Sequence, residues 1–166
     1  FINTLCLALS PIALLVVLGY SYTKRFTALC HLILGLGLAL APIGAYLAVS
    51  GEFNIIPLFF SAAVLFWVSG FDIIYSLQDE EFDKTHELHS IPVQLGKKNA
   101  LMLSNILHLL TFSALSIAGS LGGFSLYYWI GFSIFSALLV YQHTLVKEND
   151  LSKVNLAFFT TNGIAS

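Results

Sequence analysis

Five long apolar stretches, separated by short polar gaps, follow one another along this chain of 166 residues. Each stretch is about as long as the roughly 20 helical residues that span a bilayer core. A sixth apolar stretch begins near residue 154 and extends only to Ser166. Apolar runs of this length predict transmembrane helices at 1–20, 28–49, 55–76, 100–119 and 124–143.

The composition supports a membrane protein. Hydrophobic residues make up 57% of the chain and charged residues only 10%. Because an ordinary soluble domain is about one quarter charged, this chain has too few charges to cover a water-exposed surface. We therefore expect an all-α, multi-pass transmembrane helical bundle, with five complete helices and a truncated sixth. The apolar composition makes the lipid bilayer the expected partner, and the net charge of −2 suggests neither nucleic acid nor an acidic surface.

The basic residues alternate between the gaps. All seven lie in the first, third and fifth gaps, and the second and fourth gaps contain none. This alternation is what the positive-inside rule produces when a chain crosses a bilayer repeatedly. We therefore expect the odd-numbered gaps to face the cytoplasm, in a bacterial inner membrane. The basic residues are Lys24, Arg25, Lys84, Lys97, Lys98, Lys147 and Lys153.

The ends of the sequence suggest a fragment. The chain opens with Phe1, inside an apolar stretch and without an initiator Met, and its sixth stretch is too short to cross. The first stretch has no basic leader, so a plain transmembrane helix is a better interpretation than a signal peptide. We expect residues 1–166 to form a single transmembrane domain that is incomplete at both ends.

A segment rich in carboxylates leads into the third gap. If one helix ran through it, Asp72, Asp79 and Asp83 would fall within about 60° of one another at 100° per residue. Like charges on one face repel, so this face predicts a bound cation, and oxygen ligands favour Mg²⁺. A helix end with interfacial acids and no metal explains the same spacing, and both interpretations stay open.

The first gap carries the adjacent cations Lys24 and Arg25. Lys supplies a point charge and Arg a forked donor, a pair suited to a diphosphate. The positive-inside rule alone would also place them there. On the same membrane face as a Mg²⁺-binding acidic segment, however, they would complete a diphosphate site. His31 is a further candidate because it lies in a membrane helix near this pair.

Two of these segments resemble motifs of the UbiA-type intramembrane prenyltransferases, specifically the 4-hydroxybenzoate polyprenyltransferase-like branch. Residues 20–27 look like the family's Tyr-Pro-x-x-Lys-Arg-x-Thr, with Ser21 in place of the Pro. Residues 72–83 look like its second Asp-rich motif. The matching segments are Tyr20–Thr27, Asp72-x-x-Tyr75-x-x-Gln78-Asp79-x-Glu81-x-Asp83, His89-Ser90-Ile91-Pro92-x-x-x-Gly96 and Asn155-x-Ala157-Phe158-Phe159.

The resemblance implies a nine-helix fold, of which this chain would hold the fourth helix onward. It implies Mg²⁺-dependent transfer of a polyprenyl group from polyprenyl diphosphate to an aromatic acceptor resembling 4-hydroxybenzoate, in ubiquinone or menaquinone synthesis. The family's first Asp-rich motif is absent from this sequence. The chain would therefore contribute half of an active site, with its mouth on the cytoplasmic face.

The resemblance also implies roles for individual residues. Asp79 and Asp83 would bind Mg²⁺ with help from Asp72, and Tyr75 would stabilise an allylic carbocation through its ring face. The catalytic candidates are thus Asp72, Tyr75, Asp79 and Asp83. The candidates for diphosphate binding are Lys24, Arg25 and Lys84, and further candidates for substrate binding are Tyr20, His31 and Gln78.

A membrane transporter or ion channel segment is the alternative from another class, since intramembrane acids such as Asp72 often mark ion paths. Against it, the polar residues crowd at one interface, and only Glu52 is charged at the other. A purely structural membrane subunit is a third interpretation, and it predicts no Mg²⁺ requirement.

The charge alternation predicts which loops a membrane-impermeant thiol reagent can reach. In the full-length protein with all native cysteines replaced by alanine, Glu148→Cys should react only from the cytoplasmic side, because its gap is basic. Glu52→Cys should react only from the opposite side. Labelling of intact cells and of inverted membrane vesicles measures this, and labelling of both positions from one side would contradict the alternation.

Overall fold

The computed structural model describes residues 2–165, which are helical and contain no β-strand. Phe1 and Ser166, on which the expectation of an incomplete chain partly depends, lie outside the described residues. The elements are α1 (Thr4–Thr23), α2 (Cys30–Ser50), α3 (Ile55–Ser76), η1 (Leu77–Asp79), α4 (Glu80–Thr85), α5 (Ile91–Leu121), α6 (Leu126–Leu145), η2 (Leu156–Thr161) and α7 (Asn162–Ala165).

Each predicted span coincides with a helix. Among the described residues, four helical stretches are long and apolar enough to cross a membrane: Thr4–Thr23, Cys30–Ser50, Ile55–Thr85 and Ile91–Leu121. The fifth predicted span is α6, which has 20 residues like α1 but is not among these four. The predicted multi-pass helical fold is therefore confirmed, with α6 less apolar than expected.

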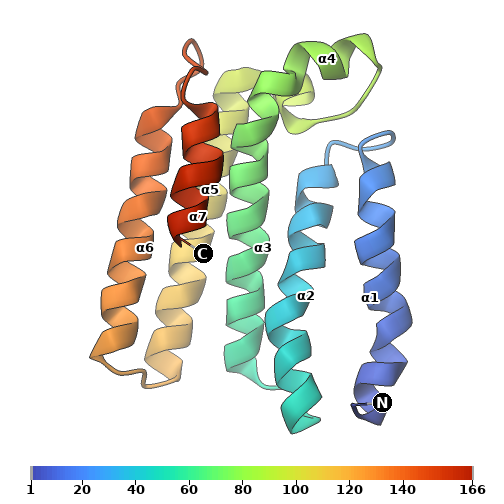
Figure 1. The fold of residues 1–166 in the computed structure, drawn as a ribbon, viewed down its shortest axis with the longest axis vertical. Coiled ribbons are helices and arrows are strands. Elements are labelled where there is room, and N and C mark those ends of the chain that lie inside the picture. Colours follow the sequence, from blue (N-terminus) through green and yellow to red (C-terminus); the bar gives the residue numbers. More distant parts are fainter. Residues whose placement is uncertain (1, 166) are drawn as a thin grey trace.

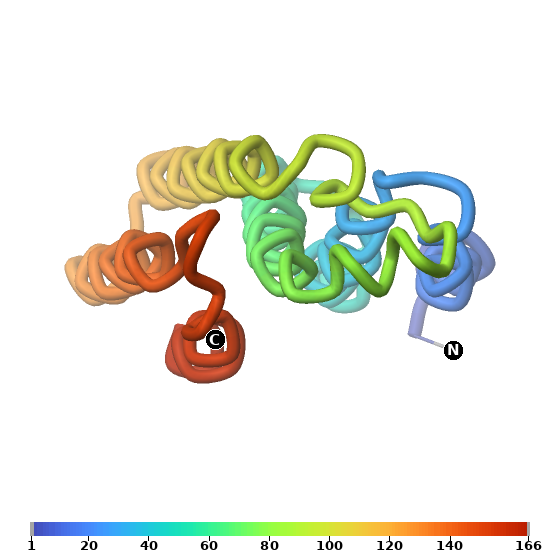
Figure 2. The backbone as a smooth tube through the Cα atoms, turned by 90° about the horizontal axis from the view of Figure 1, so that it is seen from above, coloured from blue at the N-terminus to red at the C-terminus, as the bar shows by residue number. Residues whose placement is uncertain are grey.

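The long helices stand side by side in a curved row. α1 packs on α2, α2 on α3, α3 on α5, and α5 on α6 (Figure 1). Seen along the helix axes, η2 and α7 lie on one side of this row, next to α6 (Figure 2). A buried core joins the polar end of α3 to α5 and η2, and it includes Ile73, Ile74, Leu77, Ala100 and Ala157.

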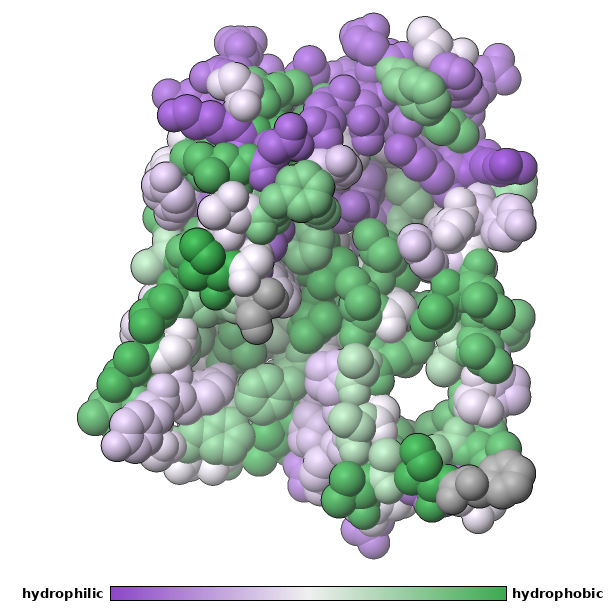
Figure 3. Space-filling view, in the orientation of Figure 1, coloured by the Kyte–Doolittle hydropathy of each residue, from purple (hydrophilic) through white to green (hydrophobic). Residues whose placement is uncertain are grey.

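One end of the bundle is polar and the rest of the visible surface is mainly apolar (Figure 3). The α1–α2 turn, the segment from η1 to the start of α5, and the loop after α6 all lie at this end (Figure 1). The α2–α3 and α5–α6 connections lie at the other end. The structure thus brings all the basic gaps to one face, as the alternation of charge predicted.

Asparagine side chains fix helix starts at the less polar end. Asn3 Oδ1 accepts a hydrogen bond from the backbone N of Cys6 (2.8 Å), while its Nδ2 donates to Leu47 O (2.7 Å). The same side chain therefore caps α1 and ties it to the end of α2. Asn54 Oδ1 caps α3 by accepting from Ile56 N (3.0 Å).

The acidic segment is not one continuous helix, which corrects the expectation of three carboxylates on one helical face. α3 ends at Ser76, the 3₁₀ turn η1 follows, and the short helix α4 crosses the polar end of the bundle (Figure 1). The change of direction moves Asp83 off the face that Asp72 occupies. α5 is also interrupted, because Gly96 has φ 76° and breaks the helix before its long part begins.

α2 and α3 approach each other closely at Gly35. A Cβ at this position would collide with Ser69 Oγ and with the backbone carbonyl of Leu65. Ser69 is fully buried and donates to His31 O (3.1 Å), so it cannot swing aside freely. Glycine at this position therefore sets the distance between α2 and α3, on which the site at the polar end depends.

We expect Gly35→Ala to destabilise the protein by about 1–3 kcal/mol, because the added methyl group overpacks a rigid contact. Gly44→Ala on the same helix is the matched control, since nothing lies within 4 Å of its added Cβ. Unfolding in detergent measures both variants. Equal effects at the two positions would contradict the close-approach explanation.

Candidate active site

A cavity of about 270 Å³ opens at the polar end, between the last turns of α1, the first turns of α2 and the end of α3. Its wall combines cationic, anionic, hydroxyl and aromatic side chains. The residues that line it are Tyr20, Ser21, Lys24, Cys30, His31, Leu34, Asp72, Tyr75, Ser76 and Asp79. The basic turn and the acidic segment that were predicted to form a site therefore meet in one pocket.

An ion pair joins these segments. Lys24 Nζ lies 2.8 Å from Asp83 Oδ1, and the Asp83 side chain is completely buried while that of Lys24 is about one third exposed. The contact lacks hydrogen-bond geometry, so both carboxylate oxygens of Asp83 are buried without a hydrogen-bond partner. Among the described residues, Lys24 is the cation in contact with this buried charge.

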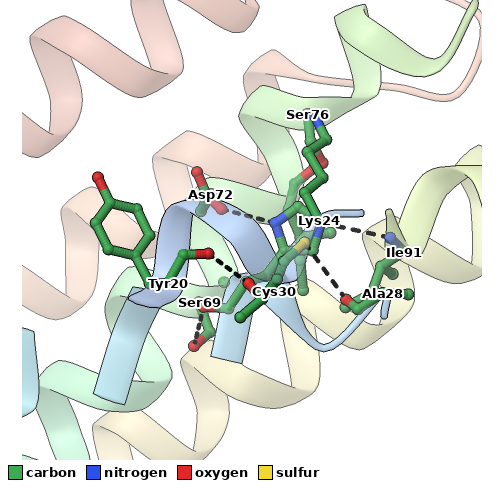
Figure 4. A network of polar contacts seen from close by, with 12 residues as sticks. Tyr20, Lys24, Ala28, Cys30, Ser69, Asp72, Ser76 and Ile91 are labelled. Carbon is green, nitrogen blue, oxygen red and sulfur yellow. Dashed lines mark hydrogen bonds and ion pairs between the residues drawn. The ribbon is translucent and has the colours of Figure 1, made fainter. Parts of the chain in front are cut away.

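A second polar pair lies deeper in the pocket. His31, the second residue of α2, is 2% exposed, and its Nδ1 lies 2.6 Å from Asp72 Oδ2 on α3. The backbone N of Ile91 donates to the other ring nitrogen, Nε2 (3.3 Å). Figure 4 shows this network around Asp72, Lys24, Cys30 and Ile91. Three separate parts of the chain are thus connected through one imidazole.

An aromatic wall leads from the pocket into the apolar part of the bundle. Tyr75 lines the pocket and packs on Phe158 at 4.2 Å between ring centroids. Phe158 contacts Phe71 (5.4 Å), and Phe71 contacts Trp67 (5.6 Å). Phe158, Phe71 and Trp67 also line an apolar groove of about 470 Å³. The polar pocket is therefore joined through the Tyr75–Phe158 contact to the wall of a groove suited to a hydrocarbon.

Some predicted site residues lie elsewhere in this conformation. Arg25 is exposed, with its guanidinium 5.8 Å from the Tyr22 ring centroid. Lys84 is exposed and bonds to Glu80 (2.6 Å). Gln78 is also exposed. Of the predicted substrate-binding residues, the pocket wall includes Tyr20, Lys24 and His31.

The carboxylates at the polar end are oxygen donors of the kind that Mg²⁺ prefers. Asp79 and Asp72 line the same pocket, and both oxygens of the buried Asp83 lack a hydrogen bond. Among residues 2–165, however, no three side chains of His, Cys, Asp or Glu are grouped as a ready metal site. Mg²⁺ commonly takes only one or two protein carboxylates and completes its shell with water and phosphate oxygens. This donor set is compatible with that mode of binding.

Several contacts at the site were not foreseen from the sequence. The Lys24–Asp83 and His31–Asp72 pairs join residues 59 and 41 positions apart, and no local spacing indicates such partners. Cys30 also lines the pocket, although it belongs to neither of the two motifs. The sequence feature that could have indicated Cys30 is its position next to His31 at the start of a helix.

The sequence matches a known family along almost its whole length. The family model described as the UbiA prenyltransferase family matches residues 1–164. The chain belongs to this family. A UbiA homolog from Aeropyrum pernix K1, whose apo structure is known, is 30% identical, with a TM-score of 0.84 over 99% of this chain and 64% of that one.

Two curated members of the UbiA family illustrate the relationship. A 4-hydroxybenzoate octaprenyltransferase of Francisella tularensis subsp. novicida (strain U112) is 31% identical over 166 residues, 99% of this chain and 57% of the relative. One of Xanthomonas campestris pv. campestris (strain B100) is 28% identical over 163 residues, 98% of this chain and 54% of the relative. The chain thus spans about half the length of these relatives.

The Lys24–Asp83 pair predicts a specific loss of stability. In the full-length protein, Lys24→Met should cost about 1–3 kcal/mol, because it leaves a buried carboxylate without its cation. Adding Asp83→Asn should recover much of this loss by removing the charge. Arg25→Met is the matched control and should change stability by less than about 0.5 kcal/mol, because Arg25 is exposed. Thermal unfolding in detergent measures the stability of each variant. Equal losses in Lys24→Met and Arg25→Met would show that the ion pair does not stabilise the protein.

Proposed function

We propose that the protein containing this chain transfers a polyprenyl group from its diphosphate to an aromatic acceptor resembling 4-hydroxybenzoate, in quinone synthesis. Family membership supports the reaction class, and the names of the two relatives support the acceptor. The single observation that carries the proposal is the meeting of Lys24 with Asp72 and Asp79 of the acidic segment in one pocket, whose Tyr75 packs on Phe158 of an apolar groove.

The charged residues of the pocket and of the surrounding polar end have distinct tasks in this reaction. Lys24 neutralises diphosphate charge as the bond between the allylic carbon and the diphosphate oxygen breaks. Asp79 and Asp83 would hold Mg²⁺, with Asp72 assisting, and the bound metal would supply Lewis-acid stabilisation of the leaving group. Arg25 and Lys84 are placed at the same polar end, where reorientation of their long side chains would bring further positive charge to the diphosphate.

The hydrocarbon part of the reaction takes place beside the aromatic wall. Breaking the allylic bond leaves a carbocation, and the ring face of Tyr75 stabilises it by about 1 kcal/mol or more in a dry site. A ring carbon of the acceptor then forms the new bond, and its proton passes to a base, for which the departed diphosphate is available. The groove lined by Phe71 and Phe158 holds the start of the polyprenyl tail. Because the tail is a lipid, the reaction needs an enzyme embedded in the bilayer.

The positive-inside alternation supports a cytoplasmic position for this pocket. A bacterial inner membrane is part of the same proposal. The transporter alternative requires polar groups that continue across the bundle. The described residues concentrate their ion pairs at one end instead, at Lys24–Asp83, Lys84–Glu80 and Lys97–Glu80.

Asp79→Asn tests the reaction and its metal together. In the full-length protein, with Mg²⁺, a polyprenyl diphosphate and 4-hydroxybenzoate, the variant should lose about 100-fold or more in turnover, because a charge-stabilising group is removed. Glu148→Gln is the matched control, since Glu148 is an exposed acid at the same end of the bundle. Chelation of Mg²⁺ should abolish turnover of the wild type.

Three outcomes would contradict parts of this proposal. Full turnover of Asp79→Asn would refute the role of that carboxylate, and turnover after chelation would refute the metal. Ion flux through liposomes that does not depend on polyprenyl diphosphate, without any prenylated product, would refute the enzyme and favour the transporter.

A further inference from the structure

The hydrogen bonds of His31 determine where its ring proton lies. The backbone N–H of Ile91 can only donate, so Nε2 of His31, 3.3 Å away, must accept. A neutral imidazole with an accepting Nε2 carries its proton on Nδ1. That proton points at Asp72 Oδ2, 2.6 Å away. Both ring nitrogens are therefore used within the protein.

The burial of the pair leaves few alternative partners for the His31 ring and the Asp72 carboxylate. The His31 side chain is only 3% exposed and that of Asp72 is 23% exposed, so water has little access to the ring. A carboxylate on a membrane helix is costly unless it is paired. The bond to Nδ1 offsets this cost and selects one orientation of the carboxylate. The remaining exposed part of Asp72 lies at the pocket, whose wall it helps to form.

The other side of the imidazole is tied to a segment that closes over the polar end. His89 N donates to Lys24 O (2.8 Å), and Cys30 Sγ lies 3.6 Å from His89 O. Ile91 N then donates to His31. These contacts attach the segment between α4 and α5 to the α1–α2 turn. Movement of this segment would therefore disturb the hydrogen bond from Ile91 to His31, the residue that holds Asp72.

We propose that His31 is a positioning residue, which fixes the carboxylate of Asp72 at the pocket wall and ties it to the first residue of α5. In this role His31 does not itself bind substrate, although the sequence placed it among the candidates for substrate binding. This role rests on the proposed function in one respect: Asp72 must act in the pocket where prenyl transfer takes place. The arrangement of the imidazole itself is independent of that function.

Two isosteric substitutions separate the two contacts. In His31→Asn the side-chain amide nitrogen takes the place of Nδ1 and still donates to Asp72, whereas the contact with Ile91 is lost. In His31→Gln the amide reaches the place of Nε2 and can accept from Ile91, whereas the donor to Asp72 is lost. His31→Ala removes both contacts and serves as the reference for complete loss.

Kinetics of the full-length protein test the role. Removing a group that orients a working side chain typically costs about 10- to 100-fold in activity, so we expect kcat of His31→Gln and His31→Ala to fall by that amount. His31→Asn should stay within about threefold of the wild type. The KM for polyprenyl diphosphate should be unchanged in all three, because a positioning role requires the ring to hold Asp72 and not the substrate. An effect of His31→Asn as large as that of His31→Ala, or a rise in this KM, would overturn the proposal.

A double-mutant cycle distinguishes positioning from general loss of structure. If His31 acts through Asp72, His31→Gln should change kcat less than about twofold in an Asp72→Asn background. Independent effects of the two substitutions would overturn the proposal. Thermal unfolding of each variant gives the folded fraction by which kcat is normalised.

A spectroscopic measurement that does not depend on enzymatic turnover separates the positioning role from the proposed function. In protein labelled with ¹⁵N-histidine, the His31 signals should show a protonated Nδ1 and an unprotonated Nε2, and Asp72→Asn should shift the Nδ1 signal. A proton on Nε2 would overturn the positioning role whether or not the protein transfers prenyl groups. Absence of transfer with the expected spectrum would refute the proposed function alone.

Discussion

Charged side chains can enter an apolar helical bundle only where another group compensates them, because an unpaired charge away from water costs several kcal/mol. The polar end of this protein follows that constraint closely. The buried carboxylate of Asp83 contacts Lys24, Asp72 contacts His31, and the largely buried Glu80 contacts both Lys84 and Lys97. Each pair joins different turns or elements, so the same contacts that offset the cost of burial also hold the elements together.

The constraint explains why the bundle and its site are inseparable. Lys24 belongs to the α1–α2 turn and Asp83 to α4, so their contact sets how far α4 lies from the first two helices. His31 bridges α2, α3 and the start of α5. Gly35 allows the close approach of α2 and α3 one turn below His31. A change in helix spacing there would therefore alter the pocket as well as the packing.

Similar pairing occurs away from the pocket. His108 Nδ1 lies 2.7 Å from His143 Nε2, which joins α5 to α6, and His108 Nε2 lies 3.3 Å from Trp67 O on α3. Ser104 donates to Gly70 O (2.7 Å) from the same face of α5. These contacts give the polar residues of the membrane helices partners and make α3 the central element of the row. The helices thus stay in register without many charged residues.

Local patterns in the sequence determined much of this protein. Apolar runs predicted the helices, the spacing of Lys and Arg predicted the polar end, and two motifs indicated the family and the segments that form the pocket. These features depend on near neighbours in the chain and on the bilayer, so they can be read without a tertiary structure. The sixth stretch also became helical, as η2 and α7.

Only the tertiary structure decided how the side chains meet. The turn at η1 moved Asp83 away from the face of Asp72, and the packing of α2 on α3 gave Asp72 its partner in His31. It also left Arg25 and Gln78 exposed, although they are neighbours of pocket residues in the sequence. Helical periodicity assigns directions only within an unbroken helix, whereas contacts between residues 41 and 59 positions apart depend on how the helices pack.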